Sequence, residues 1–449
     1  MSQILGIQTP PEWGIDPVPP ADRHLRARDL AVLWGSLGVG LLVIETGTFL
    51  AGLGLARASV AIVFGSAIGS LLLAAAGRIG AAEGVPSMVL VRPVLGIRGS
   101  LVPTALNVLQ LVGWTAFELW VMGTAAAVIG QRLFGYGGAG VWIAVFAACG
   151  TLMALGGPLA VVRQWLEKFG VWLMLAASLY LTYRLAASAD LRAMWDQPGD
   201  PKDFWLMVDL VIAMPASWLP LVADYNRFAS TPRAGFRGTF AGYFVANVWF
   251  YLLGVLAVLA MRLNPNPTPA DLAAAITVLG GGALALVVIL VDETDNVFAD
   301  IYSAAVSAQN ARPAASQRWL IVAIGGIGAV LAALAQMSDY FNFLLIIGSV
   351  FVPLFGLLLA DYYALRRGRG YHTAALYAAG GPYTYARGFN WPAIGAWVAG
   401  TAVYHWAARS GLPIGASLPS LAAAAALYLA MARIGWIRSS PDPDDPVRS

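Results

Sequence analysis

Long apolar runs constrain this chain more than any motif in it. A helix needs about 20 apolar residues to cross the ~30 Å hydrocarbon core of a bilayer. Twelve runs reach about that length, and their approximate limits are 30–56, 58–79, 101–130, 140–157, 168–188, 205–224, 238–262, 275–308, 317–336, 338–363, 389–408 and 413–436. Only 11% of the residues are charged, whereas a soluble domain has about a quarter. The sequence therefore predicts an all-α polytopic membrane protein with 12 transmembrane helices, and it argues against a soluble enzyme or a nucleic-acid-binding protein.

The distribution of basic residues predicts the topology. An even number of spans places both tails on one side, and 20 of the 27 Lys and Arg residues then fall on that side. The seven on the opposite side are Arg57, Arg132, Arg184, Arg192, Lys202, Arg262 and Arg409. By the positive-inside rule, the N-terminal tail (1–29) and the C-terminal tail (437–449) are cytoplasmic. The polar, Pro-rich N-terminus lacks the layout of a cleaved signal peptide, so we expect a multi-pass protein of a bacterial-type inner membrane.

Four spans depart from a smooth apolar pattern. Span one carries a polar stretch at 45–48, and span six carries Pro215, Ser217 and Pro220, so both sites favour unwinding. Spans three and eight carry the other polar clusters. The offset is five spans in both pairs, and because five is odd the second set must be inverted. Interrupted helices in corresponding places of two halves indicate a transporter's substrate site. The expected units are a first inverted repeat at 30–188, a second at 205–363, and spans 11 and 12 at 389–436.

Span three presents a polar stripe. Asn107, Gln110, Trp114 and Glu118 fall at i, i+3, i+7 and i+11, so they share one face of a helix. For Asn107 and Gln110, a hydrogen-bond seam between helices explains the pattern as well as ligand contact does. A Trp one turn before an acid offers a stacking surface beside a hydrogen-bonding group, which suits a planar heterocycle.

Span eight contains four carboxylates, Asp292, Glu293, Asp295 and Asp300, with no Lys or Arg between residues 280 and 308. An acid at the centre of a membrane helix costs ~2.5–3.5 kcal/mol even on a lenient scale. Protonation, a cation held by oxygens or a cationic substrate would each neutralise these acids. The alternative for Asp292 and Glu293 is a place near a helix end, in water. Asn296 lies on the same broad face as Asp292.

Two further residues are candidates for the substrate site. Glu45 lies at the expected break of span one, where its alternative role is that of a carboxylate near freed backbone N–H groups. Trp218, three residues beyond Pro215, is a candidate second aromatic wall, with ordinary packing as the competing interpretation.

Several segments also resemble one family. They are PPEWGIDPVP, LWGSLGVGLLVIETGTFLAGLGL, the loop and span GVPSMVLVRPVLGIRGSLVPTALNVLQLVGWTAFELWV, the segment LVADYNRFA, and DETDNVFADIYSAAVS. The chain resembles the nucleobase–cation symporter-1 family across most of its length. Within that family it is most similar to the bacterial branch of hydroxymethylpyrimidine transporters, which are related to cytosine permease.

The resemblance implies a leucine-transporter-like fold of five plus five inverted spans with two C-terminal helices. It implies alternating access around a heterocycle held between spans one, three, six and eight. Trp114 then matches the stacking aromatic residue, Glu118 a polar residue one turn on, and Asp300 a substrate-binding Asn. Thr294 and Asp295 match a hydroxyl pair that helps to bind sodium, and the implied cation-binding residues are Val291, Asp292, Thr294 and Asp295.

The chain departs from the family pattern in two places. A carboxylate at Asp295 replaces one hydroxyl, so the coupling cation is either sodium, held at Thr294 and Asp295, or a proton. The family's aromatic residue of span six aligns nearer Pro215 than Trp218, which weakens the case for Trp218.

The substrate chemistry follows from the carboxyl groups. A 4-aminopyrimidine presents an amine donor beside a ring-nitrogen acceptor, and a protonated carboxyl group matches that edge with two parallel hydrogen bonds. We therefore expect a secondary active importer of an aminopyrimidine that holds its substrate with Gln110, Trp114, Glu118, Trp218, Asn296, Asp300 and Glu45. The resemblance favours hydroxymethylpyrimidine, a thiamine precursor.

The alternatives are a permease for cytosine or another nucleobase, and an amine or amino-acid carrier on the same fold. An intramembrane enzyme using Asp292 and Asp295 is a weaker rival, so we expect no enzymatic activity. We expect no cofactor besides the coupling cation and no partner besides the small pyrimidine substrate and the lipid bilayer. The sequence leaves the oligomeric state open.

Overall fold

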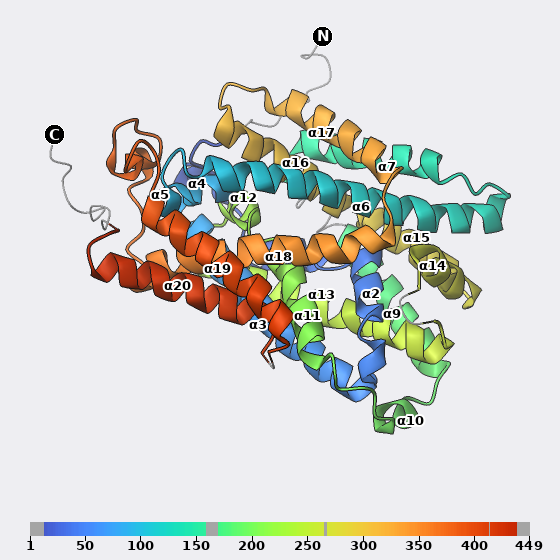
Figure 1. Cartoon of the computed structure of the whole chain (residues 1–449). Coiled ribbons are helices and arrows are strands. Elements are labelled where there is room, and N and C mark those ends of the chain that lie inside the picture. Colours follow the sequence, from blue (N-terminus) through green and yellow to red (C-terminus); the bar gives the residue numbers. More distant parts are fainter. Residues whose placement is uncertain (1–12, 159–168, 265–266, 413, 438–449) are drawn as a thin grey trace, which may run out of the picture.

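The structure is a computed structural model that describes residues 13–158, 169–264, 267–412 and 414–437 (Figure 1). In these ranges the secondary structure is helical, and the β-type pairing consists of two isolated bridges, Leu25 with Ala229 and Ala386 with Phe389. Most of the C-terminal tail and the first 12 residues lie outside the described ranges. So do Arg163 and Lys168, two of the 20 basic residues counted on the cytoplasmic side.

Helices occupy all twelve predicted runs. In the first half they are α1 (Ala27–Ser36), α2 (Leu41–Thr48), α3 (Leu55–Glu83), α4 (Ser87–Leu90), α5 (Arg92–Leu95), α6 (Leu101–Phe134), α7 (Ala139–Gly156), α9 (Val171–Ala187) and α10 (Leu191–Asp196). In the second half they are α11 (Phe204–Ser217), α12 (Val222–Asn226), α13 (Pro232–Met261), α14 (Pro269–Val278), α15 (Gly282–Asp292), α16 (Thr294–Ala311), α17 (Gln317–Ala332), α18 (Met337–Leu359), α19 (Trp391–Ser410) and α20 (Ser417–Arg433). Short 3-10 or π turns are η1 (Pro20–Asp22), η2 (Ala51–Leu53), η4 (Ala360–Leu365), η5 (Thr373–Leu376) and η6 (Pro382–Thr384).

Five described helices are long and apolar enough to cross a membrane, or six if α1 and α2 are one bent span. The five are α3, α6, α7, α13 and a helix over residues Asn342–Leu365. Several other apolar helices have only 10–17 residues, among them α9, α11, α17 and α20. Breaks shorten two of the predicted spans, because α11 with α12 and α15 with α16 each divide one apolar run. The number of twelve spans therefore stays a prediction.

The first span is broken, but not where its polar residues suggested. α1 and α2 meet at an angle of 61°, and the break lies at residues 37–40, before Glu45. Gly40 has a φ of +154°, a conformation that residues with a Cβ rarely adopt. The stretch Glu45–Thr48 is instead helical, as the end of α2. The expected unwinding at Glu45 was therefore wrong, because the backbone freedom of glycine sets the break.

The other three irregular spans behave differently from one another. In span six, Pro215 stays inside α11, and the chain leaves the helix at 218–221, next to Pro220. In span three, α6 is one unbroken helix of 34 residues, so its irregularity is limited to its polar side chains. In span eight, Glu293 separates α15 from α16.

The predicted start of span eight at residue 275 was wrong. Thr268 and Asp271 form a capping box with Pro269 at the first turn, so a separate helix, α14, begins there. The chain then turns at Gly281, where φ is +77°, and α15 starts at Gly282. Capping and the left-handed glycine override the continuous apolar composition of this run.

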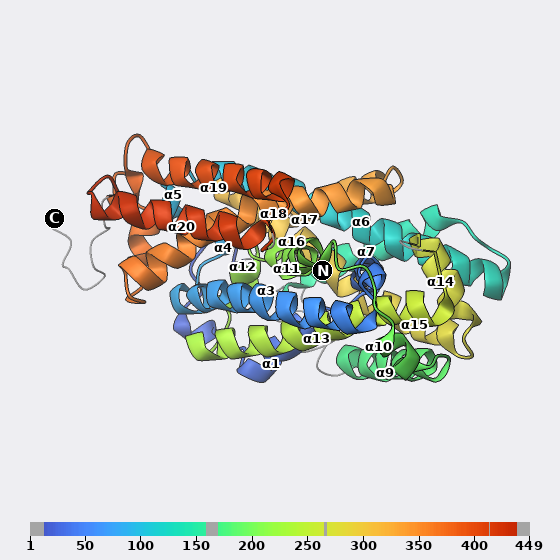
Figure 2. The same ribbon diagram turned by 60° about the horizontal axis from the view of Figure 1, so that its bottom comes forward.

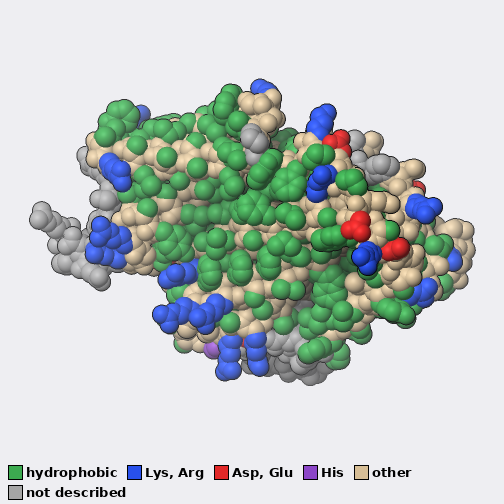
Figure 3. Space-filling model, turned by 90° about the horizontal axis from the view of Figure 1, so that it is seen from below, with side chains coloured by type: hydrophobic (Ala, Val, Ile, Leu, Met, Phe, Trp, Pro, Cys, Tyr) green, Lys and Arg blue, Asp and Glu red, His purple; other side chains and the backbone are tan. Residues whose placement is uncertain are grey.

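The outer surface is apolar over a broad band. Figure 3 shows hydrophobic side chains across the middle of one face, with Lys and Arg gathered mainly towards its two ends. Large apolar side chains point outward from several helices, for example Leu152, Trp172, Leu284 and Val330, each at least 66% exposed. Such a surface is suited to lipid and unsuited to water.

The broken helices pack against long continuous ones. α13 lies along α3 and α1, and Figure 2 shows these three side by side. α6 and α16 also pack together, and α18 packs with α19 and α20 at the other side of the molecule (Figure 1). The breaks of α1–α2 and α11–α12 therefore lie between continuous helices, which hold the exposed backbone of each break inside the protein.

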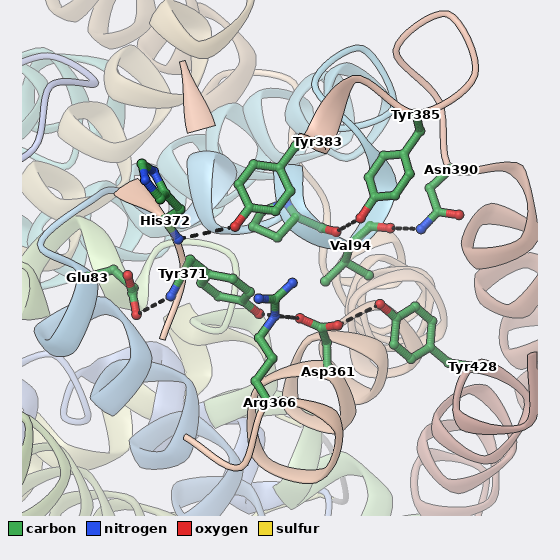
Figure 4. A network of polar contacts seen from close by, with 11 residues as sticks. Glu83, Val94, Asp361, Arg366, Tyr371, His372, Tyr383, Tyr385, Asn390 and Tyr428 are labelled. Carbon is green, nitrogen blue, oxygen red and sulfur yellow. Dashed lines mark hydrogen bonds and ion pairs between the residues drawn. The ribbon is translucent and has the colours of Figure 1, made fainter. Parts of the chain in front are cut away.

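A buried ionic cluster fixes the C-terminal helices to the end of α18 (Figure 4). The carboxylate of Asp361 accepts hydrogen bonds from Arg366 Nε at 2.8 Å, Tyr371 OH at 2.9 Å and Tyr428 OH at 2.8 Å. Burial lowers the pKa of Arg366, but the Asp361 carboxylate outweighs burial, and the net pKa is raised above its ordinary value. The cluster joins η4, the following loop and α20.

Candidate functional site

A closed cavity lies where the two broken spans meet α6 and α16. Its volume is about 10 Å³, enough for about one water molecule. It is lined by Leu37, Leu42, Val43, Trp114, Glu118, Met214, Ser217, Trp218, Leu221, Asn296 and Asp300. This volume is too small for a heterocycle, so these side chains and helices must move apart before one can bind.

Two tryptophans form aromatic walls of this cavity. Trp114 comes from the middle of α6 and is held by edge-to-face contacts with Tyr340, at 5.9 Å between ring centroids, and Phe343, at 5.4 Å. Trp218 comes from the break after α11 and meets Trp34 edge to face at 6.0 Å. Both indoles line the cavity, so each contributes an aromatic surface to it.

The acids of the cavity are buried with open hydrogen-bonding capacity. Glu118 is 5% exposed, and its Oε2 has no partner among the described residues. The Nε1 of Trp114, one turn before it, likewise has none. Asp300 reaches the cavity from α16 and is 3% exposed. A buried polar atom without a partner is costly, so these groups are suited to receiving a ligand's donors and acceptors.

Asn296 connects the cavity to the break in span one. Its Nδ2 donates to the backbone oxygen of Val39 at 3.2 Å. Val39 lies within the break, so the amide satisfies a carbonyl that lost its helical partner there. Five of the seven predicted substrate residues thus line one cavity, namely Trp114, Glu118, Trp218, Asn296 and Asp300. Their contact with substrate stays a prediction.

Gln110 and Glu45 do not line the cavity. Gln110 Nε2 donates to Asn107 Oδ1 at 2.7 Å and to the backbone oxygen of Ser217 at 3.4 Å, which makes it part of a seam between α6 and α11. Asn107 continues that seam to Ser307 Oγ at 2.9 Å. Glu45 is fully buried in α2, and neither of its oxygens has a partner among the described residues.

The predicted cation residues divide between two sides of α15 and α16. The side chains of Val291 and Thr294 line an apolar crevice between α6, α7 and α15, and Thr294 Oγ1 donates to the backbone oxygen of Leu290 at 3.4 Å. Asp292 accepts from Ser36 Oγ of α1 at 3.3 Å. Asp295 is fully buried and its oxygens have no hydrogen-bond partner within the described ranges.

The described residues contain no group of three or more His, Cys, Asp or Glu side chains that could hold a metal ion. A sodium site at Thr294 and Asp295 would therefore depend on backbone and hydroxyl oxygens, and it stays a prediction.

Glu293 belongs to the site although the sequence did not place it there. It lies between α15 and α16, is 1% exposed, and its Oε1 accepts from the backbone N of Leu42 at 3.0 Å. Leu42 lines the cavity. Gly40 has no side chain and so leaves room for this carboxylate, since a Cβ at Gly40 would lie 2.7 Å from Glu293 Oε1. The signal available in the sequence was the acid-rich stretch itself, but its orientation depends on the helix break.

The match to a protein family covers most of the chain, including every residue that lines the cavity. Residues 17–428 match the family described as "Permease for cytosine/purines, uracil, thiamine, allantoin". The chain belongs to this nucleobase–cation symporter-1 family of permeases. Among the family's curated members, the chain is 24% identical to the hydantoin permease of Microbacterium maritypicum over 407 residues, which cover 85% of this chain and 82% of that protein. It is 24% identical to the cytosine permease of Escherichia coli K12 over 354 residues, covering 77% of this chain and 78% of that one.

The fold of this permease is that of a solved member of the nucleobase–cation symporter-1 family. The transporter Mhp1, in a closed conformation with bromovinylhydantoin bound, superposes with a TM-score of 0.80 at 22% identity. The alignment covers 94% of this chain and 95% of that structure. The expectation of an all-helical, leucine-transporter-like fold is therefore confirmed, and the chain is a polytopic membrane transporter.

Proposed function

We propose that this permease imports an aminopyrimidine, hydroxymethylpyrimidine in particular, by alternating access coupled to a cation gradient. The observation that carries the proposal is that two tryptophans and two acids, Trp114, Trp218, Glu118 and Asp300, line the same cavity. The family description includes permeases for cytosine and thiamine. Both compounds contain an aminopyrimidine ring, which supports the substrate class.

The acids favour a substrate with an adjacent donor and acceptor. A protonated carboxyl group at Glu118 or Asp300 donates to the ring nitrogen and accepts from the exocyclic amine, whereas a carboxylate matches the ring-protonated form. A diketo ring such as uracil presents the reverse pattern on the corresponding edge. An ionised carboxylate only accepts hydrogen bonds, so it would leave the carbonyl of uracil or a hydantoin without a donor, and in that ionisation state it favours a ring-protonated aminopyrimidine.

Cytosine is the second candidate, because it carries the same edge and the chain has a cytosine permease among its relatives. The two compounds differ in the substituents on the ring, which would meet the apolar lining at Leu37, Val43, Met214 and Leu221. A carrier of amines would use the same acids as counter-ions and remains an outcome of the test below.

Alternating access follows from the pairing of the two breaks. We propose that residues 30–188 and 205–363 form the two inverted repeats, since the breaks in α1–α2 and α11–α12 occupy corresponding positions in them. The excess of basic residues on one side supports a cytoplasmic location of both tails in an inner membrane.

The test is uptake into proteoliposomes that contain the purified protein. Labelled hydroxymethylpyrimidine, cytosine, uracil and an alkylamine are supplied under an imposed proton or sodium gradient. We expect accumulation of hydroxymethylpyrimidine, with competition by cytosine and none by uracil or the amine. Glu118→Ala removes both the donor and the acceptor, so it should reduce apparent affinity at least about tenfold, since a hydrogen bond to a charged group is worth about 1.5–3 kcal/mol. Glu118→Gln keeps a donor and an acceptor and is the conservative variant.

Glu83→Ala is the matched control. Glu83 is also a buried glutamate, but it accepts from the backbone N of Tyr371 at 3.2 Å and does not line the cavity. Accumulation of cytosine but not hydroxymethylpyrimidine would replace the named substrate. Accumulation of the amine alone would refute the aminopyrimidine proposal.

A further inference from the structure

A second pocket lies beside the N-terminal residues of the described chain. Its volume is about 530 Å³, which is within the range of small-molecule sites. Its walls come from the N-terminal segment, α5 and the turn after it, the start of α6, the end of α16 and the loop before α19. Of the described residues, none lines both this pocket and the substrate cavity. We call it the basic pocket, and its charged and hydrogen-bonding side chains include Asp16, Arg92, Arg98, Gln309, Asn310 and Tyr377.

Arg92 brings a buried positive charge to the basic pocket. It is only 6% exposed, and it donates to Asn310 Oδ1 from Nε at 3.1 Å and from Nη2 at 2.7 Å. Its Nη1 donates to the backbone oxygen of Leu376 at 2.9 Å. Both acceptors are neutral, and Arg92 forms no ion pair with a carboxylate of the described residues. A guanidinium has five N–H groups, so these three bonds leave N–H groups on Nη1 and Nη2 for a ligand.

The charge of Arg92 is poorly compensated within the protein. Burial lowers the pKa of its guanidinium, and only the phenol of Tyr377 partly offsets this effect. Arg366 is the contrasting case, because its Nε lies 2.8 Å from the carboxylate of Asp361. An arginine stays protonated in proteins, and a buried charge without a counter-charge is costly. An anion in the basic pocket would supply the counter-charge.

The other polar side chains of the basic pocket add one cation and two acceptors. Arg98 is exposed, and its side chain has no hydrogen-bond or ion-pair partner among the described residues. Gln309 is 6% exposed, its Nε2 donates to the backbone oxygen of Ala315 at 2.9 Å, and its Oε1 has no described partner. Asp16 contributes an exposed carboxylate. The pocket is therefore suited to a ligand that has both an anionic group and a hydrogen-bond donor.

The backbone that carries the two arginines is fixed by the loop before α19. The backbone N of Ile97 donates to the Tyr383 oxygen at 3.1 Å, and that of Arg98 to the Gly388 oxygen at 2.9 Å. Asn390 Nδ2 donates to the Val94 oxygen at 2.7 Å (Figure 4). A site on a backbone that is already held loses little conformational entropy when a ligand binds.

We propose that the basic pocket binds a phosphate group that carries a hydrogen-bond donor, with Arg92 and Arg98 contacting the phosphate and Gln309 Oε1 accepting from the donor. The planar fork of a guanidinium matches two phosphate oxygens. The carboxylate of Asp16 disfavours additional negative charge, so the pocket favours one phosphate over a polyphosphate.

Two sources offer this chemistry. One is the headgroup of a phospholipid such as phosphatidylglycerol, and the other is a soluble phosphate ester such as glycerol 3-phosphate. The proposed topology places the basic pocket on the cytoplasmic side, where basic pockets between membrane helices bind lipid headgroups. The site does not depend on which heterocycle the permease imports.

The test is native mass spectrometry of the purified full-length protein in detergent. The protein is titrated separately with phosphatidylglycerol, phosphatidylcholine and glycerol 3-phosphate. We expect one phosphatidylglycerol or one glycerol 3-phosphate to bind per chain. Phosphatidylcholine has a phosphate but no donor in its headgroup, so it should bind about 2- to 10-fold more weakly than phosphatidylglycerol. Binding of the lipid alone assigns a headgroup site, and binding of the soluble ester alone assigns a soluble ligand. If neither binds to the wild type, the proposal is overturned.

Three variants show whether the bound phosphate lies in the basic pocket. Arg92→Gln should raise the Kd at least about tenfold because it removes a buried charged donor, and Arg98→Gln about fivefold because that charge is exposed. Arg237→Gln is the matched control, since Arg237 is an exposed arginine of α13 that does not line the pocket, and its Kd should stay within about twofold of wild type. If Arg92→Gln does not fold, Arg98→Gln decides, because the Arg98 side chain holds no described residue in place. Equal Kd values for Arg98→Gln and Arg237→Gln would overturn the assignment.

Discussion

A glycine contact between α2 and α13 sets the position of the first cavity wall. Gly47 of α2 and Gly254 of α13 face each other without side chains, so that the backbones touch. A Cβ at Gly47 would lie 2.9 Å from the Cα of Tyr251 and 3.0 Å from its carbonyl carbon, and closer still to its carbonyl oxygen. Carbon atoms in ordinary contact are about 3.5–4.0 Å apart, so Gly47→Ala would push α2 away by about 1 Å.

That displacement reaches the site directly. α2 carries Leu42, whose side chain lines the cavity and whose backbone N donates to Glu293. Overpacking costs about 1–3 kcal/mol, and the higher helix propensity of alanine returns up to about 1 kcal/mol. The remaining cost of about 1–2 kcal/mol falls on the closed, substrate-holding state, so we expect the Kd to rise about 5- to 30-fold.

The assay is equilibrium binding of labelled hydroxymethylpyrimidine or cytosine to purified protein. Gly52→Ala is the matched control, because a Cβ at Gly52 meets nothing within 4 Å. The two variants make the same chemical change within one short stretch of chain. If Gly47→Ala binds within twofold of wild type, the inference that this backbone contact positions the cavity wall is refuted.

Five further variants test the site and its scaffold. Trp114→Ala should weaken heterocycle binding about 10- to 100-fold, since stacking a base on an aromatic ring is worth about 1–3 kcal/mol. Trp114→Phe keeps an aromatic ring and should retain most of the affinity. Competition assays measure the affinity of both variants. Asp361→Ala should destabilise the protein by about 3–5 kcal/mol, because it leaves Arg366 buried and unpaired. Tyr428→Phe removes one hydrogen bond to the same carboxylate and should cost about 1.5–3 kcal/mol. Thermal melting in detergent compares the two variants, and equal Tm values would contradict this order. Asp209→Asn weakens the acceptor for two backbone N–H groups at the start of α20, so limited proteolysis should release that helix sooner than in wild type.

The helices were predictable because apolar composition decides them, but their ends and breaks were not. At the start of span eight, a continuous apolar run concealed the capping box at Thr268 and the turn at Gly281. In span one, the polar residues at 45–48 suggested a break that Gly40 places earlier in the chain. Polar side chains can be accommodated in a buried helix, whereas a glycine with positive φ ends it, so backbone conformation was the stronger signal.

Within the site, residues on one helix were predictable and relations between helices were not. Trp114 and Glu118 share a face of α6 by spacing alone, and the structure places both at the cavity. Glu45 is on a helix that contacts the cavity but lies off the lining, because the direction of α2 depends on the 61° bend. The contact of Glu293 with the backbone N of Leu42 joins segments far apart in sequence, and no local pattern encodes it.

The helix breaks expose backbone groups, and polar side chains of span eight satisfy them. A membrane helix without breaks satisfies its own backbone and offers a ligand only side chains, so a small polar heterocycle in a low-dielectric interior would lack partners. The break after Ser36 frees the carbonyl of Val39 and the N–H of Leu42, and these groups are satisfied by Asn296 and Glu293 from span eight. Leu42 and Asn296, which make these contacts, also line the cavity of about 10 Å³. Widening the cavity for a substrate must therefore either break these two hydrogen bonds or move span eight together with the break in span one, which links access to the cavity to the geometry of the break.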